Sequence, residues 1–214
     1  MAELKKTRKE IYSTITGIAF IIFAIAAFIV YYKTGTMHYV LWICDHTALI
    51  IGLAFLFRKW FWIGAELNLL FLPQLFWSID FLYRLFFGKF IFGFTDYMFP
   101  AYNIPLYIVS LSHIFIIPVA LIGLFLALKA SGKKERIIIR ERMKWSWRGS
   151  LMHMLLLMIP SYMLSNSINY NCALKPCFSF LPGGTIYSII WVLVVFLIVL
   201  LTNYLLNKSL KIIR

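Results

Sequence analysis

The stretch IYSTITGIAFIIFAIAAFIVYY, residues 11–32, decides the fold class, because it is a long apolar run without a charged side chain. A helix that crosses the hydrocarbon core of a bilayer, about 30 Å thick, needs roughly 20 apolar residues. The basic start followed by an apolar run is also the pattern of a signal peptide, but Tyr31-Tyr32-Lys33 is a poor cleavage site. We therefore expect a retained membrane-spanning helix.

Five more apolar stretches follow, and each is bounded by charged or turn-forming residues. The predicted helices cover residues 11–32, 40–57, 60–82, 104–128, 149–164 and 185–206. With 62% hydrophobic and 14% charged residues, a chain of 214 residues has more apolar surface than a soluble domain could bury. We predict an all-α polytopic membrane helix bundle with six transmembrane helices, forming one transmembrane domain over residues 1–214.

The Lys and Arg residues are sorted by side. Seventeen of the 21 lie in the first, third, fifth and seventh connecting pieces, and the other pieces carry only Lys33, Arg84, Lys89 and Lys175. Basic loops stay cytoplasmic because translocation of Lys and Arg is unfavourable. We therefore expect both termini in the cytoplasm, in a multi-pass protein of the cell membrane.

The net charge of +13 does not indicate a nucleic-acid partner, because the charge lies in the inner loops and tails. The inner loop 129–148 mixes Ile137, Ile138 and Ile139 with several Arg and Lys residues and ends in two Trp residues. This pattern is typical of a basic interfacial helix. Membrane lipids are the expected partners, and residues 129–148 are expected to contact anionic lipid of the inner leaflet.

Polar side chains gather at a shared depth in the outer half of the predicted bundle. A polar group in hydrocarbon costs several kcal/mol unless it is paired, so such groups are functional candidates. His46 could also be simply hydrated near its helix end, and Asp80 could pair with Arg84 four residues on. In the inner half, Glu66 is expected to be hydrated, and His153, near a basic helix end, is not a candidate.

The three cysteines suggest two uses. Cys172 and Cys177 lie in one outer connection and could form a disulfide if the outside is oxidising. Cys44 would then be a lone thiol, which is most often a buried structural residue but becomes a nucleophile beside a base. His46 lies about 200° around the helix from Cys44, so His113 on another helix is the better partner. Neither HxxxH nor CxxC occurs, so no metal site is expected.

Three motifs make the chain resemble the YwaF-like integral membrane proteins, which include a eukaryotic phospholipid acyltransferase branch, and more distantly the androgen-induced transmembrane hydrolases. They cover residues 40–190 and occur in the family's order. They are Leu41-Trp42-Ile43-Cys44, then Ser112-His113-Ile114, and then Asn169-Tyr170 with Leu174-Lys175-Pro176, Gly184 and Tyr187. The chain departs from the family where it has Pro182-Gly183-Gly184-Thr185 in place of Trp-Pro-Trp, and it lacks a further helix.

The resemblance implies that Cys44 is the nucleophile and His113 its base, in acyl transfer from a glycerolipid through a thioester. The residues are compatible with that chemistry, since His113 would take the thiol proton and return it to the leaving alcohol. Asn169 or Ser112 could donate to the developing oxyanion, and Lys175 could hold a lipid phosphate.

Tyr170, His46 and Asp80 complete the candidate substrate-binding residues. The expected function is a membrane-embedded acyl-transfer or lipid-hydrolysing enzyme of the outer half of the bilayer, with no cofactor. The alternatives are a small transporter or channel, favoured by polar and proline residues on several spans, and a non-catalytic membrane scaffold.

Overall fold

The computed structural model describes residues 2–99, 104–163 and 185–211, and in these ranges every regular element is a helix. The all-α class is therefore confirmed. The elements are α1 (Ala2–Lys33), η1 (Met37–Leu41), α2 (Ile43–Leu56), α3 (Trp60–Phe87), η2 (Asp96–Met98), α4 (Ile104–Ser110), α5 (Ser112–Ala130), α6 (Lys133–Lys144), α7 (Trp147–Met163) and α8 (Thr185–Lys211).

Four described helical stretches are long and apolar enough to cross a membrane, which supports a membrane protein. They are 8–33 in α1, α3, α4 with α5 (Ile104–Ala130), and 186–211 in α8. The other two predicted spans are shorter: α2 has 14 residues and α7 has 17. At about 1.5 Å per residue, each is shorter than a hydrocarbon core of about 30 Å.

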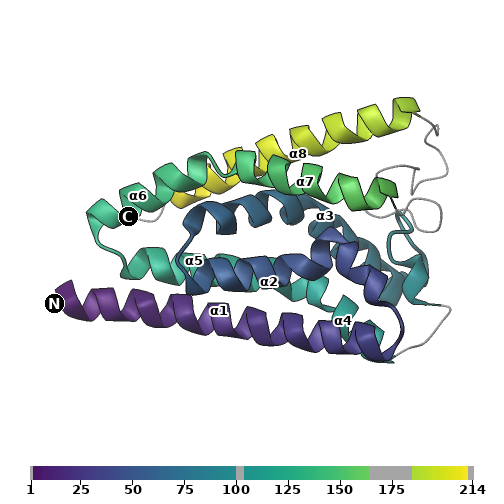
Figure 1. The fold of residues 1–214 in the computed structure, drawn as a ribbon, viewed down its shortest axis with the longest axis horizontal. Helices are drawn as coiled ribbons and strands as arrows, with labels where there is room; N and C mark the ends of the chain where they lie inside the picture. Colours follow the sequence, from purple (N-terminus) through teal and green to yellow (C-terminus); the bar gives the residue numbers. More distant parts are fainter. Residues whose placement is uncertain (1, 100–103, 164–184, 212–214) are drawn as a thin grey trace.

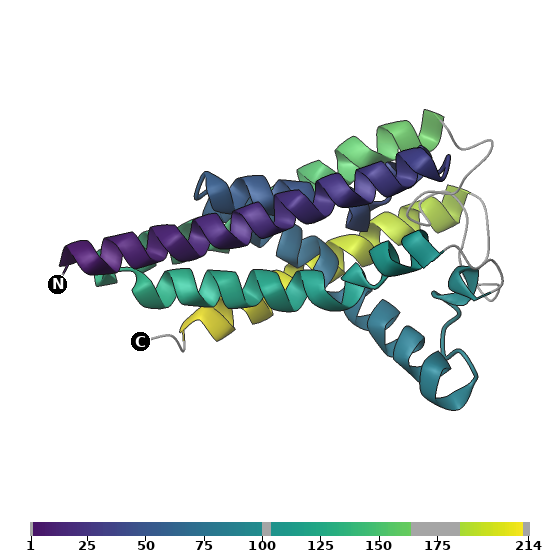
Figure 2. The same ribbon diagram turned by 90° about the horizontal axis from the view of Figure 1, so that it is seen from below.

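Helix α3 occupies the centre of the bundle and packs against α2, α5, α6, α7 and α8, while α1 packs along α2 and α5 (Figure 1). The start of α1 and the end of α8 lie at the same end of the molecule in both views (Figures 1 and 2).

Small residues let α1 and α2 approach closely. A Cβ atom on Gly17 would lie 2.9 Å from the backbone oxygen of Gly52, so neither position has room for a larger residue. The hydroxyl of Ser13 donates to the carbonyl of Phe55 at 2.5 Å and ties the same two helices together. Small residues at helix contacts and hydrogen bonds between helices are how membrane helices associate, because lipid tails are as apolar as leucine.

The segment after α3 is folded around Asp80, which is fully buried. Helix α3 contains Pro73, its second half leans out from the bundle in Figure 2, and it ends at Gly88 with φ +68°. The Asp80 carboxylate accepts hydrogen bonds from the backbone N–H groups of residues 91, 92, 93 and 95 and from the Thr95 hydroxyl.

Asp80 does not form the expected ion pair with Arg84, because the carboxylate is already surrounded by these five donors. The Arg84 guanidinium lies instead over the rings of Phe90 and Phe99, at 5.0 and 5.2 Å from their centroids. The role that the contacts give to Asp80 is to hold the aromatic segment at the end of α3.

The basic loop 129–148 contains a helix, α6, as the sequence predicts. Ile139 and Met143 are buried against the bundle, whereas Ile137 and Ile138 are about half exposed. Glu135 of α6 forms an ion pair with Lys9 of α1. Helix α6 thus has one apolar face on the bundle and leaves further apolar side chains uncovered.

Candidate functional site

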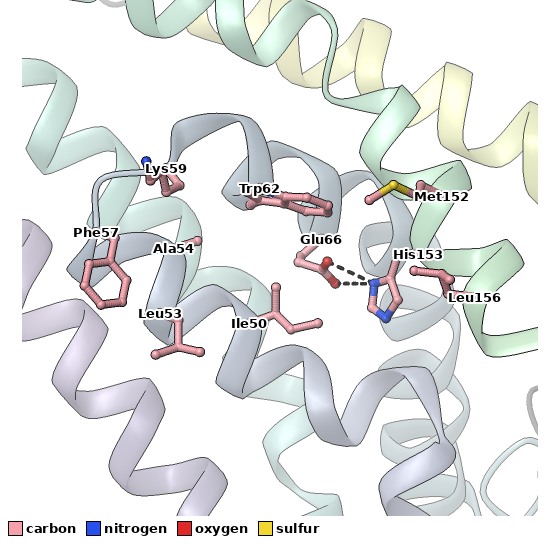
Figure 3. Close-up of a pocket in the computed structure, with 10 residues that line it drawn as sticks. All are labelled: Ile50, Leu53, Ala54, Phe57, Lys59, Trp62, Glu66, Met152, His153 and Leu156. Atoms are coloured by element: carbon pink, nitrogen blue, oxygen red, sulfur yellow. Dashed lines mark hydrogen bonds and ion pairs between the residues drawn. The ribbon is translucent and has the colours of Figure 1, made fainter. Parts of the chain in front are cut away.

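A groove of about 350 Å³ lies between α2, α3 and α7 (Figure 3). Its walls are mostly apolar, with Lys59 at one end and a carboxylate and an imidazole in its floor. The lining residues are Ile50, Leu53, Ala54, Phe57, Lys59, Trp62, Glu66, Met152, His153 and Leu156. The polar groups in the floor are the feature that distinguishes this groove from an ordinary gap between helices.

Small residues bring α3 and α7 close enough for these groups to meet. A Cβ atom on Gly149 would lie 2.7 Å from the Phe61 ring and 2.9 Å from the Ala65 side chain. One residue further along α7, the Ser150 hydroxyl donates to the carbonyl of Ala65 at 2.8 Å. These contacts fix the position of α7 beside the turn of α3 that carries Glu66.

Glu66 and His153 form a buried acid–base pair. The side chain of Glu66 is fully buried, and His153 is 7% exposed. Nδ1 of His153 lies 2.9 and 3.0 Å from the two carboxylate oxygens of Glu66, as the dashed lines in Figure 3 mark. Thr47 of α2 donates to the same carboxylate at 3.0 Å. A carboxylate bonded to one imidazole nitrogen orients the ring and so fixes the direction in which the other nitrogen points.

His46 of α2 extends the pair into a chain across three helices. Its Nε2 lies 2.7 Å from Nε2 of His153, and its Nδ1 lies 2.8 Å from the backbone oxygen of Val40. The chain therefore runs from Glu66 through His153 and His46 to Val40. Chains of carboxylates and imidazoles inside a helix bundle occur in the proton relays of membrane pumps and transporters.

The sequence analysis missed two members of this chain. The expectation that Glu66 is hydrated near Lys59 is wrong, because α7 covers the carboxylate and supplies an imidazole in place of water. His153 was set aside for its closeness to a basic helix end, yet it is buried. One signal pointed to Glu66: it is an acidic residue inside an apolar run, and such a residue is rarely left without a partner.

Cys44 has a carboxylate rather than an imidazole as its described hydrogen-bond partner. Its thiol donates to Asp45 at 3.6 Å, and the other Asp45 oxygen accepts from the Tyr31 hydroxyl. A negative neighbour opposes formation of a thiolate, whereas a base or a positive charge favours it. The contacts of Cys44 therefore differ from those of an activated nucleophile.

His113 is buried on α5, but its described contacts are with residues other than Cys44. Nδ1 lies 2.7 Å from the carbonyl of Ser110, and the ring stacks on Trp77 with the centroids 4.4 Å apart. The neighbouring Ser112 is buried as well. Among the described contacts none joins Cys44 to His113, so the dyad stays a prediction.

The remaining predicted site residues lie outside the described residues. These are Asn169, Tyr170 and Lys175, with the cysteine pair Cys172 and Cys177. Within the described ranges, no group of three or more His, Cys, Asp and Glu side chains is arranged to hold a metal ion.

The fold and groove define a class: an all-helical protein with membrane-spanning helices and a buried acid–base chain. Comparisons with known proteins do not narrow this class, because no protein-family model, no curated protein and no solved structure matches the chain.

Proposed function

We propose that this protein is an integral membrane enzyme that hydrolyses or transfers the acyl group of a lipid ester bound in the groove between α2, α3 and α7. The observation that carries the proposal is the Glu66–His153 pair, hydrogen-bonded at 2.9 Å in the floor of an apolar groove. A carboxylate that orients an imidazole is the acid–base unit of many acyl-transfer enzymes.

The lining of the groove suits a lipid better than a polar solute. Leu53, Phe57, Met152 and Leu156 are exposed apolar side chains on its walls, so an acyl chain can replace the lipid that would otherwise cover them. Lys59 is exposed at one end, where its ammonium group can attract an anionic headgroup. The substrate class we propose is therefore a glycerophospholipid or a related anionic acyl ester.

In this reaction the acid–base chain moves protons, and the substrate and acceptor make and break the covalent bonds. The oxygen of water or of an acceptor alcohol attacks the ester carbonyl carbon while its proton passes to the Glu66 carboxylate of the chain, whose oxygens can accept more hydrogen bonds than those from His153 and Thr47. The bond from that carbon to the leaving alcohol oxygen then breaks, and the chain returns one proton to this oxygen. The protein ends with the number of protons with which it began, so no other reactant is needed.

The same proposal assigns the protein six crossings, with both termini and α6 on the cytoplasmic side. The sorting of basic residues and the common end of α1 and α8 support it. In this orientation Lys59 and the adjacent end of the groove face the inner leaflet. The exposed isoleucines of α6 insert into the same leaflet. The two short helices, α2 and α7, then span the membrane together with the residues that adjoin their ends.

The test is lipid turnover by the purified protein in vesicles of phosphatidylcholine and phosphatidylglycerol, followed by mass spectrometry of released and transferred acyl chains. We expect His153→Gln and Glu66→Gln to lower the rate about 100-fold or more, the usual loss when general acid–base catalysis is removed. His38→Gln and Glu141→Gln are the matched controls, because both residues lie away from the groove lining.

Cys44→Ala and His113→Ala in the same assay test the thioester mechanism implied by the family resemblance. Turnover that is abolished by these two variants and unchanged by His153→Gln overturns the groove as the active site. Turnover that depends on His153 and Glu66 and persists without Cys44 supports acid–base catalysis without a thioester.

A second candidate function is proton-coupled transport, and the length of the hydrogen-bonded chain favours it. The chain joins ionisable side chains of three helices, and chains of such side chains inside a helix bundle mark proton paths in membrane pumps and transporters. Proton uptake into vesicles that carry the protein, with no lipid turnover and with loss of uptake in His153→Gln, would select this function.

A further inference from the structure

The imidazole rings of His46 and His153 face each other, and their other hydrogen-bond partners determine which ring nitrogens carry hydrogens. The Val40 carbonyl can only accept a hydrogen bond, so Nδ1 of His46 carries a hydrogen. In a neutral ring, Nε2 of His46 is then a bare acceptor, and it points at Nε2 of His153 from 2.7 Å. Two bare nitrogens at this distance would repel each other, so a hydrogen must lie between them.

The Glu66 carboxylate settles how many protons the chain contains. If Glu66 is ionised, it accepts from Nδ1 of His153, and that ring then carries hydrogens on both nitrogens. If Glu66 is protonated, it donates to Nδ1 of His153, and the ring carries its single hydrogen on Nε2. Both arrangements hold three protons on three groups, and both have a net charge of zero.

From this count we infer that Glu66, His153 and His46 form a binding site for one proton, which lies between the two imidazoles and is balanced by the carboxylate. An ionised glutamate with two neutral imidazoles would hold two protons, so the folded chain holds one more. Zero net charge fits the location, because an uncompensated charge between membrane helices is unfavourable. The two arrangements differ only in the position of one proton, which lies on Glu66 in one and on Nδ1 of His153 in the other, so the extra proton is shared within the chain.

Few other ionisable groups face the site. On α2 the next residue, Asp45, is bonded to Tyr31 of α1 and to Cys44, not to the imidazoles. On α3, Glu66 is the only acidic residue among the described residues that line the groove, and Lys59 lies at the far end. On η1, the ring of His38 lies against the ring of Tyr39, with 4.6 Å between the centroids. On α7 the site is flanked by Met152 and Met154. Among the described residues, the charge of the site is thus set by its own three members.

The direct test is NMR of the protein with ¹⁵N-labelled histidine in nanodiscs. The chain has only four histidines, and His38→Gln removes one signal from outside the site for assignment. We expect a coupling between the Nε2 nitrogens of His46 and His153 across the shared hydrogen at pH 8. Two uncoupled, bare Nε2 nitrogens would overturn the inference, and this measurement needs no variant of the site.

A second test counts protons through stability. Above pH 7.5 the unfolded chain holds Glu66 ionised and both imidazoles neutral, so unfolding releases one proton. We expect the folding equilibrium constant in mixed micelles to fall as the pH rises above 7.5, by up to tenfold per pH unit, which is the slope for one released proton. In His46→Gln the amide can donate to His153, no extra proton is needed, and the slope should flatten. Equal slopes in the two proteins would contradict the count. Neither measurement uses lipid turnover. Failure of the proton site can therefore be told apart from failure of the proposed function.

Discussion

Glu66 of α3 and His153 of α7 lie 87 residues apart in the sequence, and their side chains meet at 2.9 Å in the floor of the groove. The pair joins the two helices that Gly149 and Ser150 hold together, so the position of the acid–base centre depends on the packing of α3 on α7. Each residue of the pair therefore also contributes to the stability of the fold, and substitutions can measure that contribution.

Glu66→Gln should destabilise the folded protein by about 1–3 kcal/mol, because the amide replaces an acceptor that two donors share and leaves a buried hydrogen bond unmade. The measurement is equilibrium unfolding in mixed micelles. Glu141→Gln, at an exposed position on α6, is the control and should change stability by less than about 0.5 kcal/mol. Equal effects of the two substitutions would contradict the pairing of Glu66 with His153.

Gly149→Ala should separate α3 from α7 and weaken the acid–base pair without touching it. The added methyl group would meet the Phe61 ring at 2.7 Å, and overpacking of this kind costs about 1–3 kcal/mol. We expect a lower stability together with a lower rate in the lipid assay. Gly132→Ala is the matched control, since a Cβ atom at Gly132 has nothing within 4 Å. A Gly149→Ala protein as stable and active as the wild type would show that the approach of the helices is not needed.

Asp80→Asn should loosen the segment 88–95. The carboxylate accepts from four backbone N–H groups and one hydroxyl, and an amide offers a single acceptor oxygen in its place. Hydrogen exchange at Ile91, Phe92 and Thr95 should be faster by about tenfold or more, the effect of losing about 1–3 kcal/mol of local hydrogen bonding. Asp96→Asn, at an exposed position nearby, should leave these rates unchanged. Unchanged exchange in Asp80→Asn would favour a substrate-binding role over this anchoring one.

Cys44 should react slowly with an apolar maleimide, because its described partner is the Asp45 carboxyl and not a base that favours the thiolate. The measurement is the labelling rate in a background that carries Cys172→Ser and Cys177→Ser. Asp45→Asn should raise the rate severalfold by removing the negative neighbour. Fast labelling that is lost in His113→Ala would instead support the Cys44–His113 dyad.

Much of the fold could be predicted from local sequence. The six predicted stretches coincide with helices within a few residues at most ends, because a membrane helix satisfies its own backbone hydrogen bonds and needs only a continuous apolar run. The extension of α1 to Ala2 and of α8 to Lys211 adds charged turns beyond the apolar runs. The break between α4 and α5 at Leu111 lies inside the predicted helix 104–128 and was not expected.

The sequence by itself determined the all-helical class, the apolar stretches and the sorting of charge, since each follows from the residue types along one segment. The tertiary structure alone decided which polar side chains meet. Depth along a helix is linear in residue number, but the direction in which a side chain points depends on how its helix is rotated against its neighbours. For this reason His113 lies against Trp77, and the buried Glu66 is paired with His153, a residue that sequence reasoning had set aside.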